Sequence, residues 1–121
     1  MTVLDIYAQP EALPASDAAR IGRLLGLSDD AALDDVGLAD RVSRGLKPTS
    51  AAALGHVIGM PQVVGKLIPE ATLRRARTSR KPLSREMSER LYEVGRVVDV
   101  VSRIYHGDTS AIARFLNSPH P

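Results

Sequence analysis

The stretch "LSREMSERLYEVGRVVDVVSRIYHG", residues 83–107, carries the longest periodic pattern in the chain. After Leu83, apolar side chains recur at steps of three and four residues, which places them on one stripe of a helix. This seam consists of Met87, Leu91, Val94, Val98, Val101 and Tyr105. A second apolar flank is formed by Tyr92, Val97, Val100 and Ile104. We therefore predict a helix over about 84–105 whose seam serves the core or a dimer contact.

Outside this stretch, apolar spacing and stop signals predict several shorter helices. Their expected ranges are 16–25, 35–44, 50–58, 61–67, 70–80 and 109–116, with Ser16 capping the first and Thr49 or Ser50 the third. Pro10 and Pro14 make the first fifteen residues unfavourable for a helix. No alternating pattern typical of a strand is present. The fold class predicted is all-α, a helical bundle.

Length and composition exclude several classes of protein. A chain of 121 residues can form one domain, or two small subdomains, with a genuine core. It contains no cysteine, which excludes disulfides, zinc-thiolate sites and thiol nucleophiles. The N-terminal sequence has acids and prolines where a signal peptide has basic residues and an apolar run, and no stretch approaches a membrane span. We expect a cytoplasmic protein that does not enter a membrane.

The net charge of +2 conceals a division along the chain. Residues 1–40 carry eight acids against two arginines, a balance of −6, and residues 41–121 carry fourteen Lys and Arg against six acids, a balance of +8. The basic part is the candidate for a polyanionic partner. The acidic part is either a solvated face or a shield against nonspecific contacts.

Much of this basic charge lies in "IPEATLRRARTSRKPLS", residues 68–84, where five cations occupy eight residues without an acid. On a helix, Leu73 and Ala76 form a packing face and Arg74 and Arg75 point away from it. A short helix over 61–67, a break at Pro69 and this second helix follow the plan of a helix-turn-helix, although proline stands where many such turns have glycine. The candidate DNA-binding residues are Thr72, Arg74, Arg75, Arg77, Thr78, Arg80 and Lys81. A solvated basic helix, or one that meets an acidic protein surface, is the alternative.

The sequence shows no catalytic constellation. His56, His106 and His120 are scattered, without ligand spacing to a carboxylate. The four aspartates between residues 29 and 35 lie in a polar linker, and the glycines match no phosphate-binding loop. We expect no enzyme, no metal and no cofactor.

The last 55 or so residues resemble the antitoxins of the Res-Xre toxin-antitoxin systems, which share the MbcA/ParS/Xre toxin-binding domain. The resemblance rests on the "IPxxTL" turn at 68–73, the arginines after it, "LSxxxSxRL" at 83–91, "YHG" at 105–107 and the ending "ARFLNSP". It implies a DNA-binding antitoxin that represses its own operon and neutralises a Res toxin, an enzyme that consumes NAD. Thr72, Arg74 and Arg75 would take the DNA-reading role, and Arg114 and Asn117 are candidate toxin contacts.

The resemblance divides the chain into an acidic segment (1–35), a helix-turn-helix-like region (36–82) and an incomplete antitoxin domain (83–121). The family pattern continues past "NSP" with a final helix that reaches the toxin's active site, whereas this sequence stops at Pro121. We therefore expect residues 1–121 to bind the toxin weakly and leave most NAD consumption intact. A homodimer is expected, because the long helix is apolar on two flanks. A helical protein-interaction module without a DNA operator is the alternative function.

Overall fold

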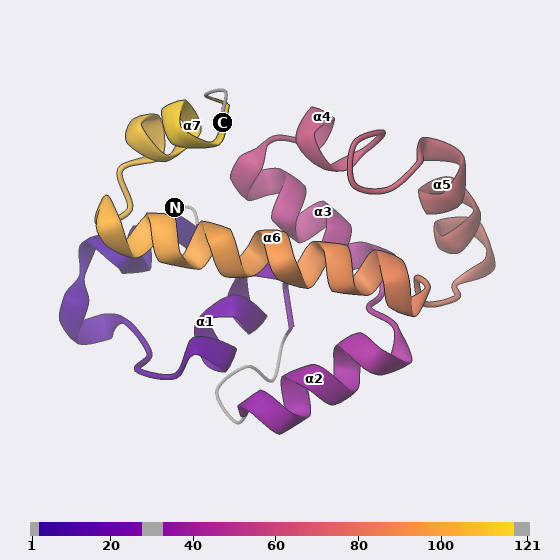
Figure 1. The fold of residues 1–121 in the computed structure, drawn as a ribbon, viewed down its shortest axis with the longest axis horizontal. Helices are drawn as coiled ribbons and strands as arrows, with labels where there is room; N and C mark the ends of the chain where they lie inside the picture. Colours follow the sequence, from indigo (N-terminus) through magenta and orange to yellow (C-terminus); the bar gives the residue numbers. More distant parts are fainter. Residues whose placement is uncertain (1–2, 28–32, 118–121) are drawn as a thin grey trace.

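The computed structural model describes residues 3–27 and 33–117, and both ranges are built of helices (Figure 1). The elements are the 3₁₀-helices η1 (Val3–Ala8) and η2 (Pro10–Ala12) and the α-helices α1 (Asp17–Leu24), α2 (Asp35–Arg44), α3 (Pro48–Ile58), α4 (Met60–Val63), α5 (Glu70–Ser79), α6 (Arg85–Ile104) and α7 (Thr109–Asn117). These residues contain no strand, only an isolated bridge between Val64 and Ile68. The predicted all-α fold is confirmed.

The long helix α6 crosses the molecule and contacts η1, α1, α2, α3 and α7 (Figure 1). It begins after Ser84, whose hydroxyl accepts a hydrogen bond from the Met87 N–H at 3.1 Å. This bond satisfies one of the free donors of the first helical turn. Leu91 and Val98 then turn to the interior and are fully buried. The helix agrees with the predicted range of 84–105 to within one residue at each end.

One hydrophobic core joins all segments of the described chain. Leu4 and Tyr7 of the acidic N-terminal segment belong to the same core as Leu73 of α5 and Ile112 of α7. Burying a leucine or isoleucine side chain of this kind contributes about 1.5 to 3 kcal/mol. The sequence boundaries after residues 35 and 82 therefore do not separate independent packing units.

The seam of α6 packs mainly against the core of the same chain. Its members divide into buried Leu91, Val98 and Val101, half-buried Met87 and Val94, and exposed Tyr105. Of the second flank, Tyr92 is half-buried against the core, and Val97, Val100 and Ile104 are exposed by 43%, 42% and 64%. At the end of this flank the rings of Tyr105 and Phe115 lie 6.4 Å apart. We call Val97, Val100, Ile104, Tyr105 and Phe115 the apolar patch.

Two predictions near the N-terminus and α3 were wrong. Within the segment expected to be non-helical, Val3–Ala8 form η1 and Pro10–Ala12 form η2, because a 3₁₀ turn needs only short i to i+3 bonds and Pro10 occupies a first position, where no N–H is required. The helix predicted over 50–58 begins at Pro48, with Lys47 before it and no side-chain cap from Thr49 or Ser50. Proline sets the helical φ at the first position and takes over the start of the helix.

The helix predicted over 61–67 is shorter than expected. Only α4, Met60–Val63, is helical, and residues 64–69 form a loop before α5. Gly65 has a φ of 92°, which turns the chain out of the helix, and its N–H donates to the Ile68 carbonyl at 2.7 Å. The break between the two helices of the predicted helix-turn-helix is thus a closed loop rather than a tight turn.

A buried polar network ties the N-terminal segment and α1 to α6. Asp99 is only 1% exposed and accepts hydrogen bonds from Tyr7 Oη at 2.7 Å and Arg20 Nε at 2.9 Å. Arg103 Nε lies 3.4 Å from the other carboxylate oxygen. Arg20 also pairs with Asp17 and donates to two backbone carbonyls before α1, at 2.8 and 2.9 Å. Both buried charges are therefore compensated, as burial requires.

This environment predicts a loss of stability at alkaline pH. Burial, the hydrogen bond to Asp99 and the negative charge of that carboxylate all raise the pKa of Tyr7 above its ordinary value. The folded protein therefore keeps the phenolic proton at a pH where the unfolded chain releases it. The resulting stability is present in full below about pH 10 and is lost as the pH rises further.

Urea unfolding followed by circular dichroism between about pH 8 and about pH 11 checks this expectation. Above about pH 10, the free energy of unfolding of the wild type should fall by up to about 1.4 kcal/mol per pH unit more than that of Tyr7→Phe. The variant has no phenolic proton to release at this position. Parallel curves for the two proteins would contradict the assignment.

Candidate nucleic-acid interface

Most of the basic stretch lies on α5. Two buried side chains attach this helix to the core, and a residue in the left-handed conformation ends it. Leu73 and Ala76 are buried and turn one face of α5 toward the core. The helix ends at Arg80, which has a left-handed φ of 56°, and the Lys81 N–H donates to the Ala76 carbonyl at 3.2 Å. This is the usual way to close an α-helix, although glycine is the residue that normally occupies such a position. The remaining faces of α5 are cationic.

Three residues, Arg74, Arg75 and Thr78, form what we call the outer face of α5. At 100° per residue they point away from Leu73 and Ala76, and all three are exposed. The Arg74 guanidinium lies 4.0 Å from Glu70, but both side chains are more than 70% exposed, so this ion pair contributes little. Arg75 has no ion pair with any residue in the described ranges.

Arg77 of α5 and the two cations that follow the helix, Arg80 and Lys81, line a concave surface that we call the basic groove, with a volume of about 590 Å³. Its lining comes from the end of α2, the start of α3 and the connection that follows α5. The lining residues are Arg44, Gly45, Lys47, Pro48, Thr49, Ala76, Arg77, Arg80, Lys81 and Pro82. Five of these residues are cationic and none is acidic. The groove therefore combines a cationic rim with a floor of proline, alanine and glycine.

The walls of the groove are brought together by a close backbone approach. Gly45 has a φ of 104°, and a Cβ at this position would lie 2.3 Å from the Leu83 carbonyl oxygen, so only glycine fits. Beside it, the Leu83 N–H donates to the Leu46 carbonyl at 2.8 Å, and the Leu46 N–H donates to Ser88 Oγ at 2.8 Å. These bonds fix the connection between α2 and α3 against the start of α6.

Most of the charge in the basic groove is not neutralised within the chain. Arg44 pairs with Asp40 at 3.1 Å, but both side chains are largely exposed. Lys47, Arg77, Arg80 and Lys81 make no ion pair with any residue in the ranges 3–27 and 33–117. The first turn of α3 adds the positive end of its helix dipole, because Pro48 and Thr49 line the groove. The surface therefore presents a concentrated positive potential to solvent.

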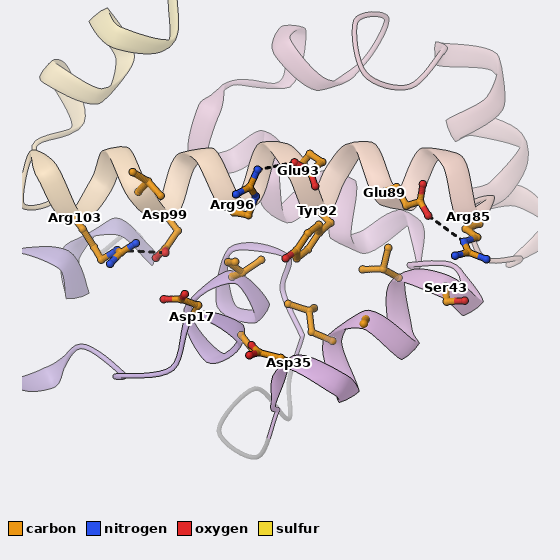
Figure 2. Close-up of a pocket in the computed structure, with 16 residues that line it drawn as sticks. Asp17, Asp35, Ser43, Arg85, Glu89, Tyr92, Glu93, Arg96, Asp99 and Arg103 are labelled. Carbon is orange, nitrogen blue, oxygen red and sulfur yellow. Dashed lines mark hydrogen bonds and ion pairs between the residues drawn. The ribbon is translucent and has the colours of Figure 1, made fainter.

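A second groove between α1, α2 and α6, of about 640 Å³, has the opposite organisation (Figure 2). Its arginines are paired with carboxylates along α6, as the dashed lines in Figure 2 show. The pairs are Arg85 with Glu89 at 3.0 Å, Arg96 with Glu93 at 3.1 Å and Arg103 with Asp99 at 3.4 Å. Because these cations are already compensated, this groove is a poor site for an anion.

The predicted DNA-binding residues thus fall into two groups. Arg77, Arg80 and Lys81 line the basic groove, whereas Arg74, Arg75 and Thr78 lie on the outer face. Thr72 is half-buried.

Thr78, one of the predicted DNA-binding residues, and its neighbour Ser79 use their hydroxyls within α5. Thr78 Oγ1 donates to the Arg74 carbonyl at 3.0 Å, and Ser79 Oγ donates to the Arg75 carbonyl at 2.6 Å. Hydroxyls of an exposed helix find these carbonyls one turn earlier as ready acceptors.

The predicted toxin contacts lie on α7, at the opposite end of α6 from α5 (Figure 1). Arg114 is exposed there. Asn117 is the last residue of the helix, and its side chain lies outside the described region of the structure. Arg114 does not line the basic groove.

Sequence reasoning missed Arg44 and Lys47. Both were counted in the positive balance of residues 41–121, but they lie 24 and 21 residues before the start of the basic stretch at Ile68. The available signal was Gly45 between them, since a glycine after a helix marks a left-handed or strained turn. Its partner across the turn, Leu83, cannot be read from the sequence.

Comparisons with known proteins identified no family for the chain: no protein-family model, curated protein or solved structure matches it. Within the described ranges, no cluster of three or more histidine, aspartate or glutamate residues could hold a metal ion. None of the described helices is both long and apolar enough to cross a membrane.

Proposed function

We propose that this chain is a cytoplasmic DNA-binding antitoxin that represses its own operon and neutralises a Res-type toxin. It acts by binding, without a catalytic step or cofactor of its own. The single observation that supports DNA binding is the unneutralised charge of α5 and the basic groove. Cations with no carboxylate partner gain free energy from DNA phosphates by releasing the counterions condensed on the duplex.

The shape of α5 also favours DNA. An α-helix with its side chains is about 10 to 12 Å wide, and the major groove of B-DNA is about 12 Å wide. The outer face of α5 carries two exposed arginines, which can donate in pairs to guanine O6 and N7. In a helix that binds no ligand, solubility alone does not require cations both on the outer face and in the basic groove, with so few carboxylates nearby to neutralise them.

The proposed antitoxin role rests on the resemblance of about the last 55 residues and on the apolar patch. Exposed apolar side chains that lie close together are typical of protein-binding surfaces. The patch lies at the C-terminal end of α6 and on α7, within the segment that resembles the toxin-binding domain.

Titration of a duplex from the region directly upstream of the gene tests DNA binding. The expected result is binding that weakens steeply with salt and is at least tenfold tighter than binding to a scrambled duplex of the same composition. Equal affinity for both duplexes would contradict a specific operator. The antitoxin role is tested by co-purification with the product of a neighbouring Res-like gene, and a complex that fails to form would contradict it.

In the absence of the toxin we expect the chain to be a dimer, in which a second copy covers the exposed apolar patch. Light scattering at micromolar concentration should give about twice the monomer mass of 13.0 kDa. Ile104→Glu, which places a charge in the patch, should shift the protein to the monomer. Glu86→Ala, an exposed change at the other end of α6, is the matched control. A wild-type mass of a single chain would contradict the prediction.

A protein-interaction module without a DNA operator is the second candidate, and the apolar patch is the observation that favours it. In that case the cations would act only by attracting an acidic protein surface. Binding to the upstream duplex no tighter than to the scrambled one, together with a stable protein complex, would favour this alternative.

A further inference from the structure

We infer that the basic groove seats the phosphodiester backbone of one DNA strand, while the outer face of α5 meets the bases. The inference rests on the proposed DNA-binding function and assigns separate roles to two groups of cations. It also adds Arg44 and Lys47 to the interface, residues that lie outside the basic stretch.

The geometry of α5 separates the two roles. Arg75 and Arg77 lie about 160° apart around the helix, so they cannot both face the floor of the major groove. When the outer face enters the groove, the side that carries Arg77 and Arg80 lies at its edge. The edge of the major groove is a phosphodiester strand, which offers one negative charge per nucleotide.

The chemistry of the basic groove suits a phosphate strand better than base edges. Its cations come from three separate segments, at Arg44 and Lys47 on one wall and at Arg77, Arg80 and Lys81 on the other. The first turn of α3 lines the same space through Pro48 and Thr49, and the positive end of its helix dipole favours an anion there. The groove lining contains no carboxylate or carboxamide side chain with which to read adenine or cytosine.

Arg80 provides a clean way to test the groove. Its φ of 56° is one that a glycine adopts without strain. Arg80→Gly should therefore remove the charge and also relieve the backbone, so the melting temperature should stay equal or rise. A loss of DNA affinity in this variant cannot then be attributed to unfolding. Lys47→Gln, on the opposite wall, is the second variant.

The experiment measures affinity for the upstream duplex and for the scrambled duplex over a series of salt concentrations. The variants are Arg80→Gly, Lys47→Gln and their combination, with Arg96→Gln on α6 as the control of equal charge change. The slope of log K against log salt is negative, and we expect it to become shallower by about 0.9 for each lost phosphate contact, and by about 1.8 in the double variant. In these groove variants the affinity should fall by the same factor for both duplexes, so the ratio of the affinity for the upstream duplex to that for the scrambled duplex should not change. Arg75→Gln should instead reduce the ratio.

Three results would overturn the inference, and they can be told apart. A slope in the double variant equal to that of Arg96→Gln would show that no phosphate lies in the basic groove, although DNA binding itself would stand. A loss of discrimination with unchanged affinity for the scrambled duplex would show that the groove reads bases. A wild type that binds neither duplex in a salt-dependent way would remove the proposed function as well.

Discussion

Replacing Asp99 by alanine should lower the free energy of unfolding by about 3 to 5 kcal/mol, the cost of removing one partner from a buried ion pair. The change leaves Arg20, which is 4% exposed, without its buried counter-ion and removes the acceptor of the Tyr7 hydroxyl. Arg20 keeps Asp17, but that carboxylate is largely exposed and compensates poorly. Urea unfolding followed by circular dichroism measures the loss.

Two further variants show whether the loss comes from the buried charge. Asp99→Asn keeps the shape and one acceptor, and should be less harmful than Asp99→Ala. Asp40→Ala removes the exposed partner of Arg44 and should cost less than about 1 kcal/mol. A loss of under about 1 kcal/mol in Asp99→Ala would mean that the network does not hold the N-terminal segment on α6.

The combined change Arg74→Ala and Arg75→Ala should weaken binding to the upstream duplex by about 2 to 6 kcal/mol. The range follows if each arginine makes a base contact of about 1 to 3 kcal/mol. Both side chains are exposed, so the stability of the fold should hardly change. A gel-shift titration of wild type and variant on the same duplex measures the difference.

The matched control is the combination of Arg85→Ala and Arg96→Ala, which changes the net charge equally. These two arginines are paired with Glu89 and Glu93 on α6 and belong to neither the outer face nor the basic groove. If both double variants lose the same affinity, net charge rather than the outer face decides binding. Wild-type affinity in the α5 variant would remove the assignment of Arg74 and Arg75.

The helices with strong caps could be predicted closely from the sequence. The predicted range of 35–44 is that of α2, because Asp34 accepts a hydrogen bond from the Gly37 N–H at 2.7 Å and Gly45 ends the helix. The charge of α5 could also be located, since five cations within eight residues are visible without a structure. Local signals of this kind act over a few residues and survive folding unchanged.

Contacts between distant residues could not be predicted in the same way. Tyr7 and Asp99 are 92 positions apart, and nothing in either neighbourhood indicates the other. The basic groove likewise depends on Gly45 meeting the Leu83 carbonyl, a contact fixed by the packing of α2 against α6. That packing, and not their spacing alone, places Arg77, Arg80 and Lys81 in the basic groove and leaves Arg74 and Arg75 outside it.

The straight course of α6 makes it a spacer between two bound bodies. Ser88, which holds the wall of the basic groove, and Ile104, in the apolar patch, are 16 residues apart, about 24 Å along the helix. A duplex in the basic groove and a protein on the apolar patch would therefore be bound near opposite ends of one helix. Because an α-helix also fixes the angle between its ends, every operator-bound copy would hold its protein partner in the same direction relative to the duplex axis.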